Sequence, residues 1–304
     1  MTALEAIDTL PRTRRGWIAA GVIVLLFVFA LVFVNRFYNV EGGMTVTGGA
    51  GPTLEGGLIV QLQPVSIDAT RNVSRMHFAF QQRGSGLVDD SERLTSNLRV
   101  TVTTGLGLSE YKFPAGTVLG QAEAEIALDG EEANYPFDRH AGFVFVAADT
   151  YQKQSDSSIV STGSIPVGLG ASGGVNGWDS TLNLSPGMST TGRADVTYDR
   201  AFSTQVFALL ILMVATVLAL LALIIGLLVN AGRRPAEAAL LSWSAALLFA
   251  LPALRSYLPN GPPIGASIDI YVYLWCMVAA GLASVLLIIG WSAQRVEAAA
   301  HRSR

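Results

Sequence analysis

The sequence predicts an integral membrane protein in which four transmembrane helices, one before and three after, carry an extracytoplasmic antiparallel β-sandwich. Of its 304 residues, 51% are hydrophobic and 14% are charged, a scarcity of charge that is unusual for a soluble domain. Four long runs, at 17–34, 206–229, 238–254 and 270–293, contain no charged residue. The intervening residues 35–203 are mostly polar and carry short segments that alternate as β-strands do.

The four runs are long enough to be membrane spans, because a helix needs about 20 apolar residues to cross about 30 Å of hydrocarbon. We expect the spans at 17–34, 204–229, 238–254 and 270–293. The first run follows a basic stretch, as the apolar part of a secretory signal peptide does. Residues 35–38 after it do not form a small-residue cleavage site, so we expect a retained anchor.

Basic residues orient the spans, because short cytoplasmic segments are enriched in Lys and Arg. The segments 1–16, 230–237 and 294–304 together hold eight basic residues, whereas the loop 255–269 holds only Arg255. We therefore expect both termini and the short loop between the second and third spans in the cytoplasm. The large polar domain and the last loop would lie outside a bacterial plasma membrane.

The polar domain, 35–203, is predicted to be all-β. Its candidate strands share apolar–polar alternation or a short apolar run and lie at 60–63, 76–81, 98–103, 122–129, 143–146, 178–184 and 194–199. No helical pattern of comparable length interrupts them, which favours a two-layer sandwich. Pro64 shifts the alternation and indicates an edge strand or a bulge. The glycine-rich stretches 42–57 and 168–177 are predicted loops, the first a flexible lead from the anchor.

Charge and cysteine content limit the partners of this domain. It carries 18 acidic and 11 basic residues, which argues against nucleic acid or anionic lipid surfaces as broad ligands. The single cysteine, Cys276, falls in the fourth span, so no disulfide can form within the chain. The domain must therefore be held together by its own apolar core.

The most distinctive local motif is the segment from Asn134 to His140. Pro136 fixes the backbone φ and bends the chain, which would let Tyr135 and Phe137 project as an apolar tip. Asp138 is of the type that stabilises turns by accepting backbone hydrogen bonds. Both a structural turn and a binding or signalling loop are compatible with this pattern.

The outer loop 255–269 is the second distinctive segment. Its prolines, which include Pro262 and Pro263, predict a stiff turn between the third and fourth spans. Arg255 and Asp269 lie at its two membrane edges, where they could pair with each other or with the outer domain.

We predict that the two segments pack together, with Asp138 or Asp269 near Arg255. This would couple the domain to the membrane helices through Tyr135, Pro136, Phe137, Asp138, Arg139, Arg255, Pro262, Pro263 and Asp269.

Two resemblances bear on these segments. The run Tyr135–Asp138 resembles the loop at the base of the extracellular sandwich of pentameric ligand-gated ion channels, which implies a coupling loop. The order of spans departs from that family, and the second span has only Thr216 as a polar interruption, so a channel is not expected.

Over its whole length the chain resembles a family of uncharacterised actinobacterial, particularly mycobacterial, four-span membrane proteins. Their shared features here are Tyr135–Asp138, Arg255, Pro262–Gly265 and Asp269, and the resemblance implies a cell-envelope location.

Signatures of catalysis, metal binding and transport are weak. No His, Cys or carboxylate set has metal-ligand spacing, and no nucleophile elbow or phosphate loop is present. Gly168, Gly170 and Gly173 match a dinucleotide pattern but lack a following helix. An acidic cluster can bind a cation or form a solvated strand face; its members are Glu123, Glu125, Glu131 and Glu132. The last three spans lack internal charges of the kind that ion-coupled carriers use.

We therefore expect no catalytic residue, cofactor or metal, and a non-enzymatic accessory or scaffold subunit of a membrane complex. The partners would be membrane lipid and other membrane or envelope proteins, or further copies of the chain, but not nucleic acid. An extracytoplasmic module that binds a lipid, glycolipid or peptide is the alternative, and an envelope enzyme is a third. Small residues in the last two spans would serve packing within the chain or against a membrane partner.

Overall fold

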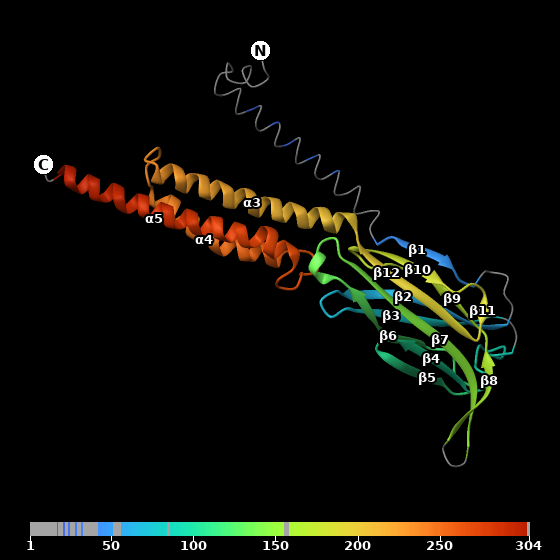
Figure 1. Ribbon diagram of the computed structural model, residues 1–304. Helices are drawn as coiled ribbons and strands as arrows, with labels where there is room; N and C mark the ends of the chain where they lie inside the picture. Colours follow the sequence, from blue (N-terminus) through green and yellow to red (C-terminus); the bar gives the residue numbers. More distant parts are fainter. Residues whose placement is uncertain are drawn as a thin grey trace. The chain divides into compact units, whose positions relative to one another are not determined.

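The computed structural model describes residues 42–50, 56–83, 86–154 and 158–302, and five helical positions near the N-terminus, Trp17, Gly21, Val24, Val28 and Val32. Apart from those five positions, the predicted first span lies outside the described residues. Residues from Gly42 onward form one compact unit of strands followed by helices (Figure 1).

The described residues form 12 strands. Their bounds are β1 Met44–Gly48, β2 Gly57–Asp68, β3 Val73–Arg83, β4 Leu98–Thr104, β5 Gly107–Phe113, β6 Gln121–Gly130, β7 Arg139–Lys153, β8 Ile159–Ile165, β9 Val167–Ala171, β10 Trp178–Leu184, β11 Met188–Ser189 and β12 Thr191–Arg200. All seven predicted strands fall within this set, in β2, β3, β4, β6, β7, β10 and β12. The five that alternation did not reveal are β1, β5, β8, β9 and β11.

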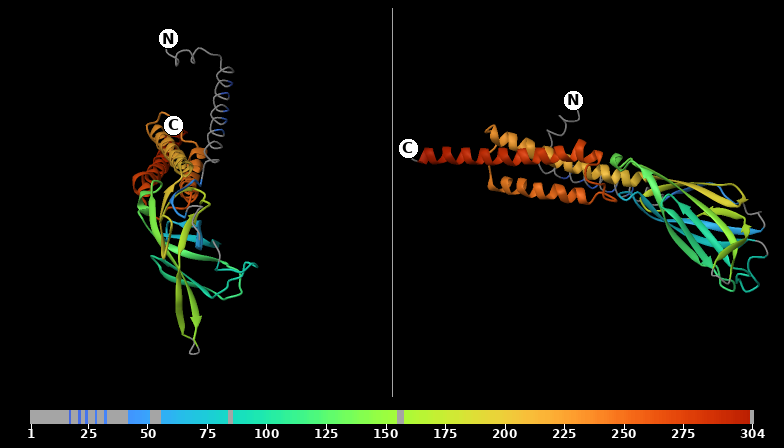
Figure 2. Two further views of the ribbon diagram at one scale, coloured as in Figure 1. Left: turned by 90° about the vertical axis from the view of Figure 1, so that its right-hand side faces the viewer. Right: turned by 60° about the horizontal axis from the view of Figure 1, so that its bottom comes forward.

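One hydrogen-bonded path links the strands in the order β1-β10-β12-β7-β6-β3-β2-β9-β11, with β4, β5 and β8 attached to it by way of β7. The sheet curves into an open half-barrel (Figure 2). It is mixed, because β1 runs parallel to β10 and β2 runs parallel to β9. The prediction of purely antiparallel pairing is therefore wrong. β6 and β7 join over only three residue pairs.

Period-two alternation builds the core. In β4 every second residue is buried, and Leu58, Val60 and Leu62 of β2 are completely buried. These side chains meet buried residues of other strands, such as Phe78 of β3 and Trp178 of β10, in one apolar cluster. Burying one such side chain contributes about 1.5–3 kcal/mol, so the filled interior holds the curved sheet together. The register of β2 against β3 shifts between Pro64 and Ser66, so of the edge strand or bulge predicted at this proline, the structure shows a bulge-type irregularity.

Both predicted glycine-rich loops contain strands. Met44–Gly48 forms β1, so part of the predicted flexible lead is tied to β10. Val167–Ala171 forms β9, whose first three residues are buried. A Cβ on Gly168 would lie 2.6 Å from Cβ of Ala50, and one on Gly170 would lie 2.5 Å from the Gln61 side chain. Close backbone approach thus accounts for two of the glycines in the apparent dinucleotide pattern.

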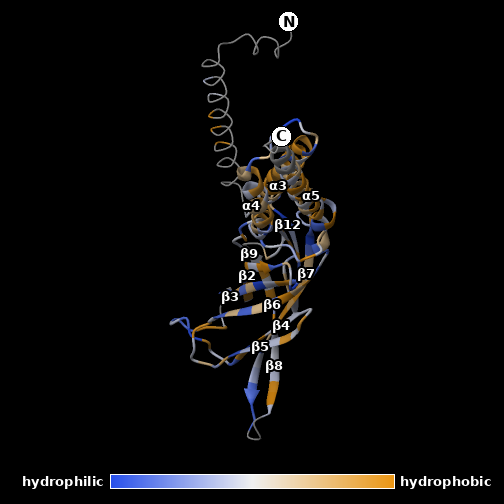
Figure 3. Ribbon diagram, turned by 90° about the vertical axis from the view of Figure 1, so that its left-hand side faces the viewer, coloured by the Kyte–Doolittle hydropathy of each residue, from blue (hydrophilic) through white to orange (hydrophobic). Residues whose placement is uncertain are grey.

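Three helices follow the sheet: α3 Phe202–Asn230, α4 Ala238–Ser256 and α5 Leu274–Arg302, the last preceded by the π-helical turn η2 Asp269–Tyr273. Among the described residues, the helical stretches 202–230, 238–256 and 269–294 are long and apolar enough to cross a membrane (Figure 3). The helices pack side by side through small residues: a Cβ on Gly226 of α3 would lie 3.0 Å from the carbonyl oxygen of Ala283 in α5.

Candidate coupling site between the sheet and the helices

The sheet passes into the helices with almost no linker. β12 ends at Arg200 and α3 begins at Phe202. The backbone N–H of Ala201 donates to the carbonyl of Gly177 over 3.0 Å, and the hydroxyl of Thr204 donates to the same carbonyl over 3.2 Å. These bonds fix the first turn of α3 against the loop that precedes β10.

Arg200 and Asp138 form a buried ion pair at this junction, each with a side chain only 1% exposed. Nε of Arg200 lies 2.9 Å from Oδ1 of Asp138, and Nη2 lies 3.0 Å from Oδ2. Such a bidentate pair is geometrically specific as well as strong. Burial alone would raise the pKa of Asp138, but hydrogen bonds from His140 and Arg200 outweigh it and hold that pKa below its ordinary value.

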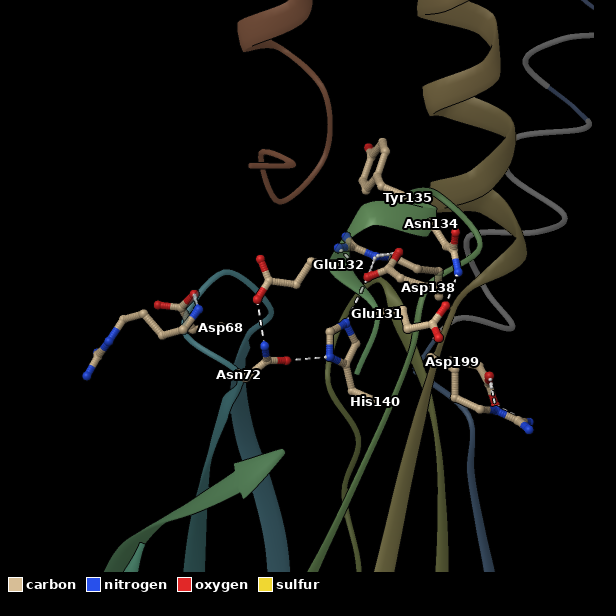
Figure 4. A network of polar contacts seen from close by, with 12 residues as sticks. Asp68, Asn72, Glu131, Glu132, Asn134, Tyr135, Asp138, His140 and Asp199 are labelled. Atoms are coloured by element: carbon tan, nitrogen blue, oxygen red, sulfur yellow. Dashed lines mark hydrogen bonds and ion pairs between the residues drawn. The ribbon is translucent and has the colours of Figure 1, made fainter. Parts of the chain in front are cut away.

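A chain of polar contacts continues from this pair into the sheet (Figure 4). Nε2 of His140, which is completely buried, lies 2.9 Å from Oδ2 of Asp138. Its Nδ1 lies 3.0 Å from Oδ1 of Asn72, whose amide nitrogen donates to Glu132 over 2.6 Å. The chain therefore joins the start of β7 to the turn between β2 and β3 and to the 3₁₀ turn η1 Glu132–Asn134.

Two oxygen atoms flank the ring of His140. The carboxylate of Asp138 lies beside one ring nitrogen, and the amide oxygen of Asn72 lies beside the other. Gly130 provides the space, because a Cβ there would lie 2.1 Å from Nδ1 of His140.

Aromatic rings enclose the guanidinium of Arg200. Its Cζ lies 4.2 Å from the ring centroid of Trp178 and 4.8 Å from that of Tyr135. Cations near such ring faces are stabilised by about 2 kcal/mol when water is excluded. Trp178 also meets the His140 ring edge-on at 5.4 Å. The same enclosure desolvates the Tyr135 hydroxyl, and this burial raises the pKa of Tyr135 to about 12.

The carbonyl of Pro259 connects this site to the loop between α4 and α5. It accepts a hydrogen bond from the hydroxyl of Tyr135 over 3.0 Å and a longer one from Nη1 of Arg200 over 3.5 Å. The Ser267 hydroxyl donates to the carbonyl of Ala133. Tyr135 also belongs to a small buried apolar cluster with Ala208, Leu212, Leu258, Ala266 and Ile268. The Tyr135 turn therefore packs both on the outer loop and on α3.

The outer loop is closed by its own ion pair. Nε and Nη2 of Arg255 lie 2.7 and 2.6 Å from the two carboxylate oxygens of Asp269. Nη2 also reaches the carbonyls of Pro262 and Pro263, at 3.3 and 3.2 Å. The backbone N–H of Gly265 donates to Asp269 over 2.9 Å. The loop therefore folds around the guanidinium of Arg255, which pairs with Asp269 as predicted. The partner of Asp138 is Arg200 rather than Arg255.

The remaining predicted residues separate into buried and exposed groups. Pro136 is buried beside Tyr135, whereas Phe137 is 62% exposed. Arg139 points outward and forms a bidentate pair with Asp199, at 2.7 and 3.0 Å. The structure therefore places Tyr135, Pro136 and Asp138 in the junction and leaves Phe137 and Arg139 on its surface.

Comparison with known families divides the chain at this junction. Residues 48–198 match the family model described as Domain of unknown function (DUF4436). Residues 200–294 match the one described as Domain of unknown function (DUF8686). No match was found among the curated proteins. The Asp138–Arg200 pair joins the two matched regions, because each contributes one partner.

Sequence reasoning missed Arg200, Trp178 and Asn72 as members of the site. Arg200 carried a signal, since Ala194, Val196 and Tyr198 point inward and the same period places Arg200 inward next. A buried arginine needs a carboxylate partner. Among the described residues, no group of three or more His, Cys, Asp or Glu side chains is arranged to hold a metal ion. The charges of Arg200 and Asp138 are paired with each other.

Proposed function

We propose that this protein is a four-span membrane protein of the bacterial cell envelope that serves as a non-enzymatic accessory or scaffold subunit. Its strands would form an extracytoplasmic sandwich-like domain, with both termini in the cytoplasm. The envelope location follows from the resemblance to actinobacterial four-span proteins. Three helices long and apolar enough to cross a membrane support the membrane location.

The observation that carries the proposal is the buried Asp138–Arg200 pair at the point where β12 becomes α3. A domain joined by a flexible tether can sample many orientations, whereas this one is fixed by the ion pair and by the bonds to Pro259. A fixed orientation is useful to a protein that must present a surface at a set height and angle to neighbouring membrane proteins.

The orientation of the chain can be tested by cysteine labelling, because the native Cys276 is buried. Leu108 is 61% exposed on β5, and Ala231 is exposed after α3. Leu108→Cys should react with a membrane-impermeant maleimide in intact cells, and Ala231→Cys only after permeabilisation. The reverse pattern would contradict the proposed topology.

The scaffold role can be tested by crosslinking in cells, followed by mild detergent extraction and measurement of particle mass. The wild type and Asp199→Asn should run as an assembly larger than one chain. Asp138→Asn removes the ion pair with Arg200 and so loosens the junction between the sheet and the helices. This variant should reach the membrane but lose much of that assembly. Recovery of all three only as monomers under several mild conditions would contradict the proposal.

A further inference from the structure

Three cavities at and below the junction share lining residues. A polar cavity of about 370 Å³ is lined by Asp129, Gly130, Glu131, Asn134, Phe137, Arg139 and Ala141. An adjoining cavity of about 480 Å³ shares Asn134 and Phe137 with it and continues over α3 and η2. A third, of about 330 Å³, shares Tyr271 and Val272 with the second and continues between α3 and α5. Each volume lies in the range of about 300–1,000 Å³ that is typical of ligand sites.

The two inner cavities are apolar. Leu209 and Leu212 of α3 line the first, and Leu220 and Trp275 line the second. We call these two cavities together the groove. Its midpoint is the π-helical turn η2, which carries Tyr271 and Val272. Single π-turns within helices often occur at functional sites. The groove follows the direction of the predicted spans and would meet lipid chains rather than water.

The outer cavity has the opposite character, and we call it the head pocket. The carboxylates of Asp129 and Glu131 are exposed there, beside the amide of Asn134. Phe137 stands between the head pocket and the groove with 62% of its surface exposed, and Tyr271 on the groove side is 77% exposed. Carboxylates and amides accept hydroxyl hydrogen bonds, and exposed aromatic faces offer apolar area next to them.

We propose that the head pocket and the groove together bind one membrane lipid whose head group is uncharged and rich in hydroxyl groups, such as a glycosyl diacylglycerol. The acyl chain lies in the groove between α3 and α5. The head group lies against Phe137 and donates hydroxyl hydrogen bonds to Asp129, Glu131 and Asn134. The inference rests on the proposed membrane insertion of the helices but not on the scaffold role.

Charge selects this head group over a phosphate. Among the described residues that line the three cavities, Arg139 is the only cation, and Asp199 already neutralises it through two hydrogen bonds. A phosphate in the head pocket would face two carboxylates without a free guanidinium or ammonium group to offset their repulsion. The change from a polar lining in the head pocket to an apolar lining in the groove fits an amphiphile better than a peptide, which would leave backbone polar groups unpaired in the groove.

The test uses the full-length protein in detergent micelles and native mass spectrometry with three dioleoyl probes: digalactosyl diacylglycerol, phosphatidylglycerol and diacylglycerol. We expect digalactosyl diacylglycerol to be retained about fivefold or more over the other two. Phe137→Ala and Glu131→Gln should each lower its retention about three- to tenfold, as the loss of one or two contacts implies. Both side chains are exposed, so neither change should disturb folding.

Matched controls come from β6 and β7, the two strands that flank the turn with Glu131 and Phe137. Phe143 is 40% exposed on β7 and Glu123 is exposed on β6, and neither lines the three cavities. Phe143→Ala and Glu123→Gln should retain the galactolipid like the wild type. Equal retention of the three probes, a preference for phosphatidylglycerol, or equal losses in the controls would overturn the proposal. The cysteine labelling tests membrane insertion separately, so an inserted protein without selectivity would contradict the lipid site alone.

Discussion

The guanidinium of Arg200 and the carboxylate of Asp138 form a bidentate pair whose side chains are each only 1% exposed, and Arg200 lies two residues before Phe202, where α3 begins. The pair joins β7 to the end of β12, and through the Pro259 carbonyl it reaches the loop between α4 and α5. The pair is therefore one of several contacts between the sheet and the helices, beside the bonds Tyr135–Pro259 and Ser267–Ala133.

Removing one charge of the pair should be strongly destabilising. Asp138→Asn leaves the buried Arg200 uncompensated, and breaking a buried pair in this way costs about 3–5 kcal/mol. Asp199→Asn is the matched control, because it removes the carboxylate of the exposed Arg139 pair on the neighbouring position of β12. We expect a large drop in the thermal unfolding midpoint of the first variant in detergent and little change in the second. Equal shifts would contradict a special role for the buried pair.

Acid should remove the contribution of the Asp138 carboxylate to the stability of the folded protein. Its folded pKa lies below the ordinary value, so the stabilisation is fully present above the unfolded pKa of about 3.9 and is lost as the pH falls through the folded pKa. The difference in unfolding midpoint between the wild type and Asp138→Asn should therefore be constant from about pH 5 to 7 and narrow below about pH 4. A difference that widens in acid would mean that Asp138 is protonated in the folded protein.

At high pH, ionisation of the buried side chains of Tyr135 and Tyr198 should destabilise the folded protein. Burial raises the pKa of both Tyr135 and Tyr198 to about 12, above the unfolded value of about 10. Their contribution to stability is thus present below about pH 10 and is lost as the pH rises towards 12. Unfolding followed by tyrosinate absorbance should begin at a higher pH in the double variant Tyr135→Phe/Tyr198→Phe. An unchanged alkaline transition would assign it to other groups.

The hydroxyl of Tyr135 should stabilise the outer loop in particular. Tyr135→Phe removes the 3.0 Å bond to Pro259, at a cost of about 0.5–1.5 kcal/mol, and should speed amide exchange in residues 258–266. Tyr198→Phe removes a bond of the same length to Ser74 inside the sheet. It should lower stability similarly but leave exchange in the outer loop unchanged. Loop exchange that responds equally to both changes would show global loosening instead of local coupling.

The space at Gly130 should be essential to His140. Gly130→Ala places a methyl group within 2.1 Å of Nδ1 of His140, so the imidazole must move and its bonds to Asp138 and Asn72 must lengthen. We expect a loss of about 1–3 kcal/mol. Gly261→Ala is the control, because nothing lies within 4 Å of its added Cβ. A normal unfolding midpoint for Gly130→Ala would show that the His140 network contributes little.

Local patterns in the sequence predicted much of the fold. Period-two alternation, together with one short apolar run at 143–146, located seven strands, because burial on one or both faces leaves these signatures in a strand. It missed β5 and β8, whose residues are mostly exposed, and β9, whose glycines match a loop pattern. Parallel pairing of β1 with β10 left no local trace, since it joins residues more than 100 positions apart.

Hydropathy, alternation and proline content are local properties, so the residues alone predicted the apolar helices, the position of most strands and the two segments that meet at the junction. They also placed Asp269 among the candidate partners of Arg255, since both lie at the edges of one loop. Three relationships became visible only in the folded chain: Asp138 pairs with Arg200, Trp178 and Tyr135 enclose the guanidinium, and a polar cavity lies beside apolar ones. Those relationships depend on how β7, β12 and the α4–α5 loop converge in space, and a buried charge is assigned to its partner only when that convergence is known.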